Sequence, residues 1–515
     1  MRPFPEYKLL NFRKFLSPKQ ANKLSDSFHN FYNKFVEPYE AMQPEIHTSF
    51  PGPKTIEYNA KLSKIIGNNQ NLREVINLEK SFGNYFQDLD GNVVLDMHMD
   101  NGKNIFGYNY RKWVQHAKMG KYNQYLTQKP SLGYTPPVEY PKMLMELLNK
   151  VGPKNLHEVL LTNGSGSAAN DAAIKIAMLN KLYDLKGNDN LSKGEIMDCF
   201  AKRKLSVLGF EGGYHGNYLS TLSVNSTGNN NATLYAGVTT ANWPVAPFPK
   251  LKYPYNENYD YNISEEKRCI EETANLIKAH VNKNPIAAII IEPLQLFSGM
   301  RYASSIFYRD LLDLCNENKI SFIVDETNTS GWANGRPFMY LNWNLEKTPH
   351  FVTFGNRMQI AGVFYQQELR ANKHNNPDLS NLLCSSEEDP NKLIQFFQTY
   401  EMVYKVDWLD THCSQFTETV KAELVDMQRK WNVPIENIRG IGKMFGFDVA
   451  STTLRDEIVQ LSRERGFKIN PIGDKTIGFT PSLLFTEIHF ARYKEMLLNL
   501  NPASANQFCP SMNIL

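Results

Sequence analysis

The chain lacks the cysteine spacings that mark a zinc site or a redox pair. Its six cysteines are scattered at positions 199, 269, 315, 384, 413 and 509, and no two have the Cys-x-x-Cys spacing. We therefore expect no metal site. We expect reduced and mostly buried thiols, which favour a reducing compartment such as the cytosol or the mitochondrial matrix.

Long apolar runs and a strong charge imbalance are also missing. The longest apolar run, Ile286 to Ile291, is far too short to span a bilayer, which takes about 20 residues. Lysine and arginine number 56 and aspartate and glutamate 53, which leaves a net charge of +3. The composition thus gives no electrostatic case for nucleic acid, and we expect no transmembrane segment.

The beginning of the chain is basic. Residues 1–23, MRPFPEYKLLNFRKFLSPKQANK, carry six basic side chains and one acidic one. Interleaved leucine and phenylalanine make this stretch weakly amphipathic, as in a mitochondrial transit signal. A retained basic arm that docks on a partner fits the same residues, so both interpretations stay open. We treat residues 1–48 as a basic helical arm.

Strand-like and helix-like segments alternate in the centre of the chain. Short β-rich runs are separated by stretches with apolar residues three and four positions apart. The alternation predicts an α/β fold, with a mainly parallel sheet covered by helices on both faces. The runs are HEVLLTN, LSVLGF, IAAIII, SFIVDE, FVTF and GVFY, and the helical stretches include 168–182, 264–281 and 305–318. Another helix is predicted to begin at Ser192, with Glu195 three residues on as a capping box.

The pattern changes after about residue 370. Long helical stretches at 391–404 and 411–430 lead into the shorter strands GKMFGFDVA and KTIGFTP, which predicts a smaller α+β lobe. A length of 515 residues allows two or three domains at about 150 residues each. Beyond the arm we predict the N-terminal part of a small domain (49–125), a large domain (126–370) and the C-terminal part of the small domain (371–515).

Two glycine-containing segments are interpreted as local turns. Asp90-Gly91 stands between two apolar runs and predicts a β-hairpin. RGIGKMFG has a glycine spacing that resembles a dinucleotide-binding loop. Its glycines do not follow a strand and open a helix, so we discount that function.

Three further segments carry residues suited to a flat, anionic ligand. In TNGSGSAANDAAIKIA a strand ends at Thr162 and a Gly/Ser turn leads into a helix, which places Gly166 and Ser167 to hold a phosphate. In GFEGGYHGNYLS, Tyr214 could stack on a heterocycle or be a core tyrosine. In SFIVDETNTSG, Asp325 ends a strand at the edge where open α/β sheets bind ligands, and it could pair with a pyridine nitrogen.

Together with FVTFGNRMQIAGVFY, these segments resemble the class III aminotransferases, pyridoxal-phosphate enzymes of fold type I, and most of all their 4-aminobutyrate aminotransferase branch. The resemblance is collinear from about residue 49 to 500 and includes text with no catalytic duty, such as FPGPKT and WPVAPFPKLKYP. The cofactor-site positions that it implies here are Gly166, Ser167, Tyr214, His215, Asp325, Asn328 and Ser385.

The resemblance breaks at the lysine that forms the Schiff base. In the family this lysine stands four residues before a glycine-containing pair. Counting back from Ala361 places Arg357 there, and the neighbouring lysine is Asn356. Arginine stays protonated and cannot form the aldimine, so we expect no catalytic residue at this position. The flanking FVTF and GVFY segments support this register.

Other family positions have changed as well. The two arginines that bind the substrate carboxylate are replaced by Asn217 and Thr480, and an acidic residue near the substrate amine is replaced by Phe297. The glutamine that follows the pyridine aspartate is Asn328. Cysteines that link subunits through an iron–sulfur cluster in animal relatives are Ser165 and Ala168, so no cluster is expected. Ser385 matches a threonine that reaches the partner's phosphate.

These losses lead to three competing hypotheses. The first is a pseudoenzyme that serves as a structural or assembly subunit of a mitochondrial complex, with a cytoplasmic location as the alternative. The second is a protein that binds pyridoxal phosphate without a covalent bond, with Arg357 near an anion. The third is an active 4-aminobutyrate-type transaminase with a displaced lysine. The family forms dimers, which implies a homodimer here or a heterodimer with a related aminotransferase subunit.

Overall fold

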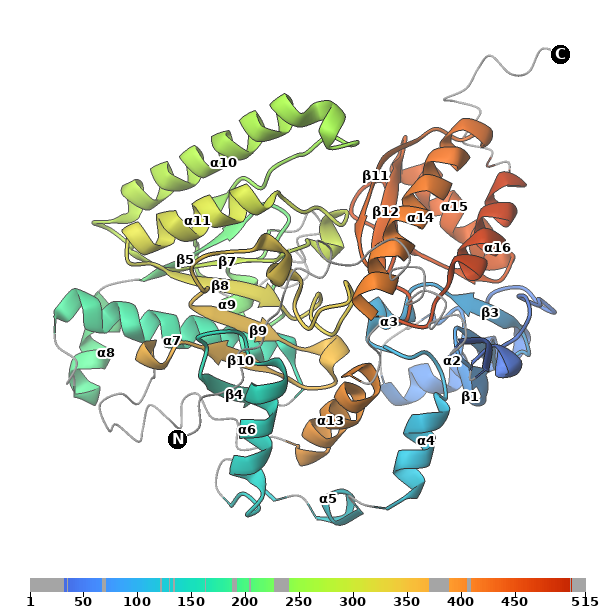
Figure 1. Ribbon diagram of the computed structural model, residues 1–515, viewed down its shortest axis with the longest axis horizontal. Coiled ribbons are helices and arrows are strands. Elements are labelled where there is room, and N and C mark those ends of the chain that lie inside the picture. The colour runs from blue at the N-terminus through green and yellow to red at the C-terminus, as the bar shows by residue number, and fades with distance from the viewer. Residues whose placement is uncertain are drawn as a thin grey trace.

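The protein is described by a computed structural model with two lobes (Figure 1). The structure describes residues 32–34, 36–66, 71–120, 123–128, 130–132, 135–162, 164–187, 192–202, 205–226, 240–369, 389–404, 409–500 and 502. Residues 1–31, most of the predicted N-terminal arm, lie outside this part of the chain, and so does Ser385.

A seven-stranded sheet forms the centre of the larger lobe. Its strand order is β4-β10-β9-β8-β7-β5-β6, and only β10 runs antiparallel to its neighbours. The predicted α/β fold with a mainly parallel sheet is confirmed. The strands are β4 (Glu158–Thr162), β5 (Ser206–Phe210), β6 (Val245–Ala246), β7 (Ile286–Ile291), β8 (Ser321–Glu326), β9 (Phe351–Phe354) and β10 (Ala361–Tyr365).

Helices cover both faces of this sheet, because its central strands bury side chains on both sides. Ile289 of β7 lies in one apolar cluster with residues of α11, while Ile290 lies in the cluster beneath α7. This alternation follows from the two-residue period of a strand. Figure 1 shows α10 and α11 on one face and α7 on the other. The bounds are α7 (Gly166–Lys186), α10 (Tyr259–His280) and α11 (Ser305–Glu317).

The smaller lobe combines segments from both ends of the chain. One sheet has the order β1-β2-β3-β13, and its parallel pair joins Leu95 to Phe467. The other sheet has the order β11-β12-β15-β14. Its strands and those of the first sheet are β1 (Ile76–Phe82), β2 (Tyr85–Asp88), β3 (Val93–Asp96), β11 (Ile435–Ile441), β12 (Met444–Val449), β13 (Phe467–Lys468), β14 (Asn470–Ile472) and β15 (Thr476–Phe479).

An aromatic core holds this lobe together. Phe445 and Phe479 stack with ring centroids 4.7 Å apart, and helices α14, α15 and α16 cover the sheets (Figure 1). The longer remaining helices are α2 (Pro53–Ile66), α4 (Arg111–Lys118), α6 (Tyr140–Val151), α8 (Lys193–Lys202), α13 (Pro390–Tyr404), α14 (Leu409–Lys430), α15 (Thr452–Glu464) and α16 (Glu487–Leu498). The domain boundaries given above stay predictions.

Several local predictions are confirmed. Gly91 has a φ of +98° in the turn between β2 and β3, and RGIGKMFG forms the β11–β12 hairpin rather than a helix start. The side chains of Ser192 and Glu195 form the expected capping box at α8. Three cysteines, Cys269, Cys315 and Cys413, are buried free thiols.

Across the described ranges, no helix combines the length and apolarity needed to cross a membrane, and no cluster of three metal-binding side chains occurs.

The hairpin aspartate has a second role that the turn motif did not reveal. The Asp90 carboxylate accepts hydrogen bonds from the backbone N–H groups of Lys54 (2.7 Å) and Thr55 (3.0 Å) at the start of α2. We expect Asp90→Ala to lower the free energy of unfolding by about 1 kcal/mol, as for other lost N-terminal caps. Urea denaturation measures this loss. Glu79→Ala, on an exposed position of β1, is the control and should change little.

Candidate functional site

The segments selected from the sequence meet at one edge of the large sheet. β4 leads into the Gly166 turn, β5 into Tyr214, β8 ends beside Asp325, and β9 leads into Arg357. Because β5, β8 and β9 are parallel, their carboxyl ends lie at the same edge. This is where open α/β sheets bind ligands.

Asp325 lies at the centre of a buried hydrogen-bond network. Its Oδ2 accepts from His215 Nδ1 at 2.7 Å and from Asn170 Nδ2 at 2.8 Å. Its Oδ1 accepts from the backbone N–H of Thr327 at 3.0 Å and from the Thr327 hydroxyl at 2.6 Å. A carboxylate offers about four lone-pair positions. Protein donors therefore satisfy the acceptor capacity of Asp325.

Sequence reasoning missed Thr327. It stands two residues after Asp325, a spacing at which hydroxyl side chains often bond to local groups, and this was the available signal. Its side chain also crowds the phosphate turn, because a Cβ on Gly166 would lie 2.7 Å from the Thr327 Cβ. Thr327 thus links the aspartate to the turn.

The turn at the start of α7 keeps its helix-capping geometry. The Ser165 side chain accepts from the backbone N–H of Ala168, and Gly166 packs closely on Gly355. A Cβ on Gly216 would lie 2.2 Å from the Ser167 Oγ, so a glycine is needed there. The first N–H groups of a helix lack intrahelical partners and favour anions, so this turn has a geometry suited to a phosphate.

Aromatic and polar contacts fill the neighbourhood of Tyr214. The ring of Phe297 meets it edge to face, with centroids 4.9 Å apart. The Tyr214 hydroxyl donates to Asn217 Oδ1 at 2.9 Å, and its backbone N–H donates to Glu292 at 3.0 Å. Burial, and then the charge of Asp325, raises the pKa of Glu292 well above its ordinary value. Two of the altered positions, Asn217 and Phe297, therefore contact Tyr214 directly.

Thr480, Asn356 and Asn328, which we also expect to differ from the family, contact other groups of the protein. Thr480 is buried, and its hydroxyl donates to the backbone carbonyl of His98 at 2.7 Å. Asn356 Nδ2 donates to Asn328 Oδ1 at 2.9 Å. Neither arrangement leaves a cationic group to bind a substrate carboxylate at these positions.

Arg357 is the most unusual residue of the site. Its side chain is 0% exposed, and within the described ranges all three guanidinium nitrogens lack a hydrogen-bond partner. The guanidinium does not join the Asp325 network but packs against Gly102 of the smaller lobe. Burial lowers the pKa of Arg357 to about 10, so the group is still charged at neutral pH.

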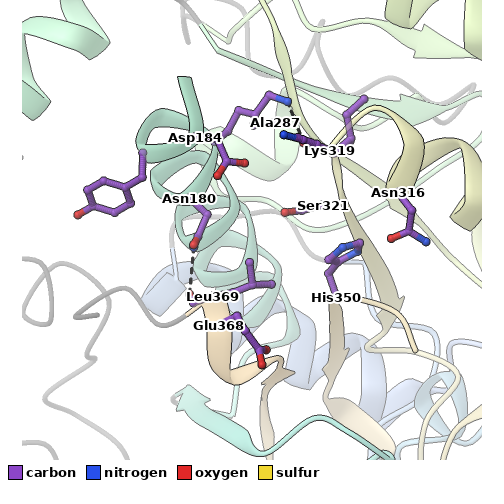
Figure 2. A pocket seen from close by; sticks show the side chains of 12 residues that line it. Asn180, Asp184, Ala287, Asn316, Lys319, Ser321, His350, Glu368 and Leu369 are labelled. Atoms are coloured by element: carbon purple, nitrogen blue, oxygen red, sulfur yellow. Dashed lines mark hydrogen bonds between the residues drawn. The ribbon is translucent and has the colours of Figure 1, made fainter. Parts of the chain in front are cut away.

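A separate cavity lies at the opposite edge of the sheet (Figure 2). Its volume is about 340 Å³, and Ser321 at the start of β8 and His350 just before β9 line it together with α7. Asp325 is at the other end of β8. This cavity is therefore distinct from the site assembled above.

The family model for class-III aminotransferases matches residues 66–500. The chain belongs to the class-III aminotransferases. The mitochondrial 4-aminobutyrate aminotransferase of Sus scrofa is 30% identical over 452 residues, covering 87% of this chain and 88% of that protein. The probable mitochondrial 4-aminobutyrate aminotransferase of Caenorhabditis elegans is 31% identical over 456 residues, with coverages of 87% and 92%.

Solved class-III-like structures share the fold. The lysine aminotransferase from M. tuberculosis in its internal aldimine form aligns with a TM-score of 0.72 at 20% identity, covering 86% of this chain and 98% of that one. An amine transaminase from an uncultivated Pseudomonas species, with pyridoxal phosphate bound as the internal aldimine, has a TM-score of 0.70 at 20% identity, with coverages of 84% and 96%. The predicted fold type I architecture is confirmed.

The residues present do not fit pyridoxal phosphate held in the way of these aldimine structures. Arg357 offers no amine that could condense with an aldehyde. The carboxylate that would face the ring nitrogen is already saturated by His215, Asn170 and Thr327. Only the turn at Gly166 keeps a geometry suited to the phosphate, so we derive no reaction step through this cofactor.

Proposed function

We propose that this class-III aminotransferase is catalytically inactive and serves as a structural or assembly subunit of a mitochondrial complex. The observation that carries the proposal is Arg357, a buried, charged guanidinium at the position where the family has its Schiff-base lysine. Transamination needs an amine that alternates between an aldimine and a proton carrier, and a guanidinium does neither.

The changed substrate positions support the same proposal. An enzyme that only changed its substrate would exchange its carboxylate-binding arginines but keep its lysine. Here Thr480 and Asn217 replace the arginines, and their polar atoms are engaged within the protein. The scaffold and the phosphate turn persist while the groups for substrate and covalent chemistry are absent.

The mitochondrial location is inferred from the relatives and from the basic N-terminal segment. Both relatives described above carry "mitochondrial" in their names. We propose a homodimer or a heterodimer with a related aminotransferase subunit, in which Ser385 would approach the partner's site. Native mass measurement of the complex isolated from mitochondria tests this composition.

The proposal is tested by mixing the purified protein with pyridoxal phosphate, reducing with borohydride and mapping the adducts by mass spectrometry. We expect no site-specific adduct at a buried lysine and no transfer of the amino group from 4-aminobutyrate to 2-oxoglutarate. Arg357→Lys restores an amine at the family position and is expected to give an adduct at residue 357 without turnover, because the carboxylate-binding arginines are still missing.

Two outcomes distinguish the other hypotheses. A mapped adduct on another buried lysine, together with turnover, would show an active transaminase with a displaced lysine. Saturable binding of pyridoxal phosphate without an adduct would show a noncovalent binding protein. In that case Gly166 and Ser167 are the residues to test, since they form the phosphate turn.

A further inference from the structure

The Arg357 guanidinium is a buried cation for which the described chain provides no counter-charge. Among the described residues none of its three nitrogens has a hydrogen-bond partner, and the side chain is 0% exposed. Burying an unpaired charge is strongly unfavourable, and arginine cannot relieve the cost by losing its proton. A bound anion would offset the unfavourable free energy of this buried charge.

The groups that lie directly against the guanidinium are neutral. It lies against Gly102, and the carbonyl oxygen of Thr480 is close to the same point. The Thr480 hydroxyl is directed to His98, and the nearby Cys413 thiol faces the Trp332 carbonyl. Burial raises the pKa of Cys413 to about 12, so the thiol does not supply a negative charge at neutral pH.

A second buried cation lies close by and increases the positive potential. Lys443 is 0% exposed, and its Nζ contacts His412 Nε2 at 2.9 Å and the Phe485 carbonyl at 2.7 Å. Burial lowers the pKa of Lys443 to about 8. Lys443 and Arg357 both act electrostatically on Cys413, as does the carboxylate of Asp410.

The backbone is strained where it meets Arg357. Met99, Asp100, Asn101 and Gly102 have φ values of +49°, +52°, +58° and +77°, a left-handed turn that costs free energy for the first three residues. The turn presents a residue without a side chain to the guanidinium. Strained backbone of this kind is concentrated at ligand sites and switches.

We propose that Arg357 binds a small monovalent anion, chloride or one of similar size, at the junction of the two lobes. The proposal rests on the proposed loss of the Schiff-base lysine, because the site exists only with arginine at residue 357. A small anion fits best, because Gly102 packs tightly on one side of the guanidinium. The anion would neutralise the charge and hold the lobes together.

The test is the thermal stability of the full-length protein in sodium chloride and in sodium gluconate at equal ionic strength. For the wild type we expect the melting temperature to rise and saturate with chloride, as for a ligand that binds only the folded state. Arg357→Met removes the charge with little change in length and is expected to abolish the chloride effect. Arg309→Met, on an exposed side chain of α11, is the matched control and should keep it.

The proposal is wrong if Arg357→Met retains the full chloride response, or if gluconate stabilises the wild type equally. It is also wrong if only inorganic phosphate or pyridoxal phosphate stabilises. Should Arg357→Met not fold, Arg357→Lys keeps a charge and should keep part of the response. Crystals soaked in bromide must show an anomalous peak beside residue 357. These results do not depend on adducts or turnover, so they can fail separately from the proposed function.

Discussion

Replacing Gly102 with alanine is expected to lower the free energy of unfolding by about 3 kcal/mol. A Cβ at this position would lie 1.5 Å from Nη1 of Arg357, so the guanidinium or the left-handed turn must move. Overpacking of a well-packed site costs about 1–3 kcal/mol, and the positive φ of +77° adds about 1 kcal/mol for any side chain. Urea denaturation of the variant and the wild type measures the loss.

A matched glycine separates the two contributions. Gly187, at the end of α7, also has a positive φ (+59°), but a Cβ there meets nothing within 4 Å. Gly187→Ala therefore reports the backbone cost alone. Combining Gly102→Ala with Arg357→Ala should recover the steric part only. If Gly102→Ala costs no more than Gly187→Ala, the close contact between Gly102 and Arg357 does not exist in solution.

Removing His489 is expected to destabilise the protein by about 1–3 kcal/mol, because it deprives a buried carboxylate of one of its hydrogen-bond donors. His489 Nε2 lies 2.9 Å from Oε2 of Glu40, and the two side chains are 0% and 3% exposed. The Tyr32 hydroxyl donates to the same carboxylate, and Asn84 donates to its other oxygen. His489→Ala leaves the buried Glu40 carboxylate without the imidazole N–H that donates to it.

The control is a solvent-exposed contact between a lysine and a glutamate. Glu57 and Lys61 are 2.6 Å apart on α2 with side chains 67% and 71% exposed, and we expect Lys61→Ala to change stability little. Denaturation by urea compares the two variants. Equal effects at the buried and the exposed pair would contradict the importance assigned to Glu40 and His489.

The pair also predicts how stability depends on pH. Burial alone would raise the pKa of Glu40, but His489, Tyr32 and the Asn84 backbone together hold it below its ordinary value. The stabilisation is therefore present above the pKa of glutamate in the unfolded chain, about 4.3, and is lost as pH falls through the lower folded value. The wild type should lose more stability than His489→Ala on acidification below about pH 4.3.

Much of the fold could be predicted because its signals are local. The apolar runs of β7 and β8 show fully buried strands, and the Ser192–Glu195 spacing shows a helix start. The order of the strands in a sheet depends on contacts between distant parts of the chain. The pairing of Leu95 with Phe467 joins residues far apart in the chain, and no short pattern carries that information.

The candidate site also has features that the sequence could predict and features that depend on the tertiary structure. The sequence predicts that Arg357 replaces the lysine because flanking strands support the register, and the chemistry of arginine excludes an aldimine at this residue wherever the side chain points. The saturation of Asp325 by Thr327, His215 and Asn170 could not be read, because two of its three donors come from distant elements.

By itself, the sequence determined the family and the main strands and helices, and it predicts the loss of the Schiff-base amine, since each depends on residue type and spacing along the chain. Only the tertiary structure decided that the Arg357 guanidinium is fully buried, packed on Gly102 and, within the part of the chain that the structure describes, without a hydrogen-bond partner. Burial and pairing are properties of the space between two lobes. That space is built from residues more than 250 positions apart in the chain (102 and 357), so no stretch of sequence around either residue contains it.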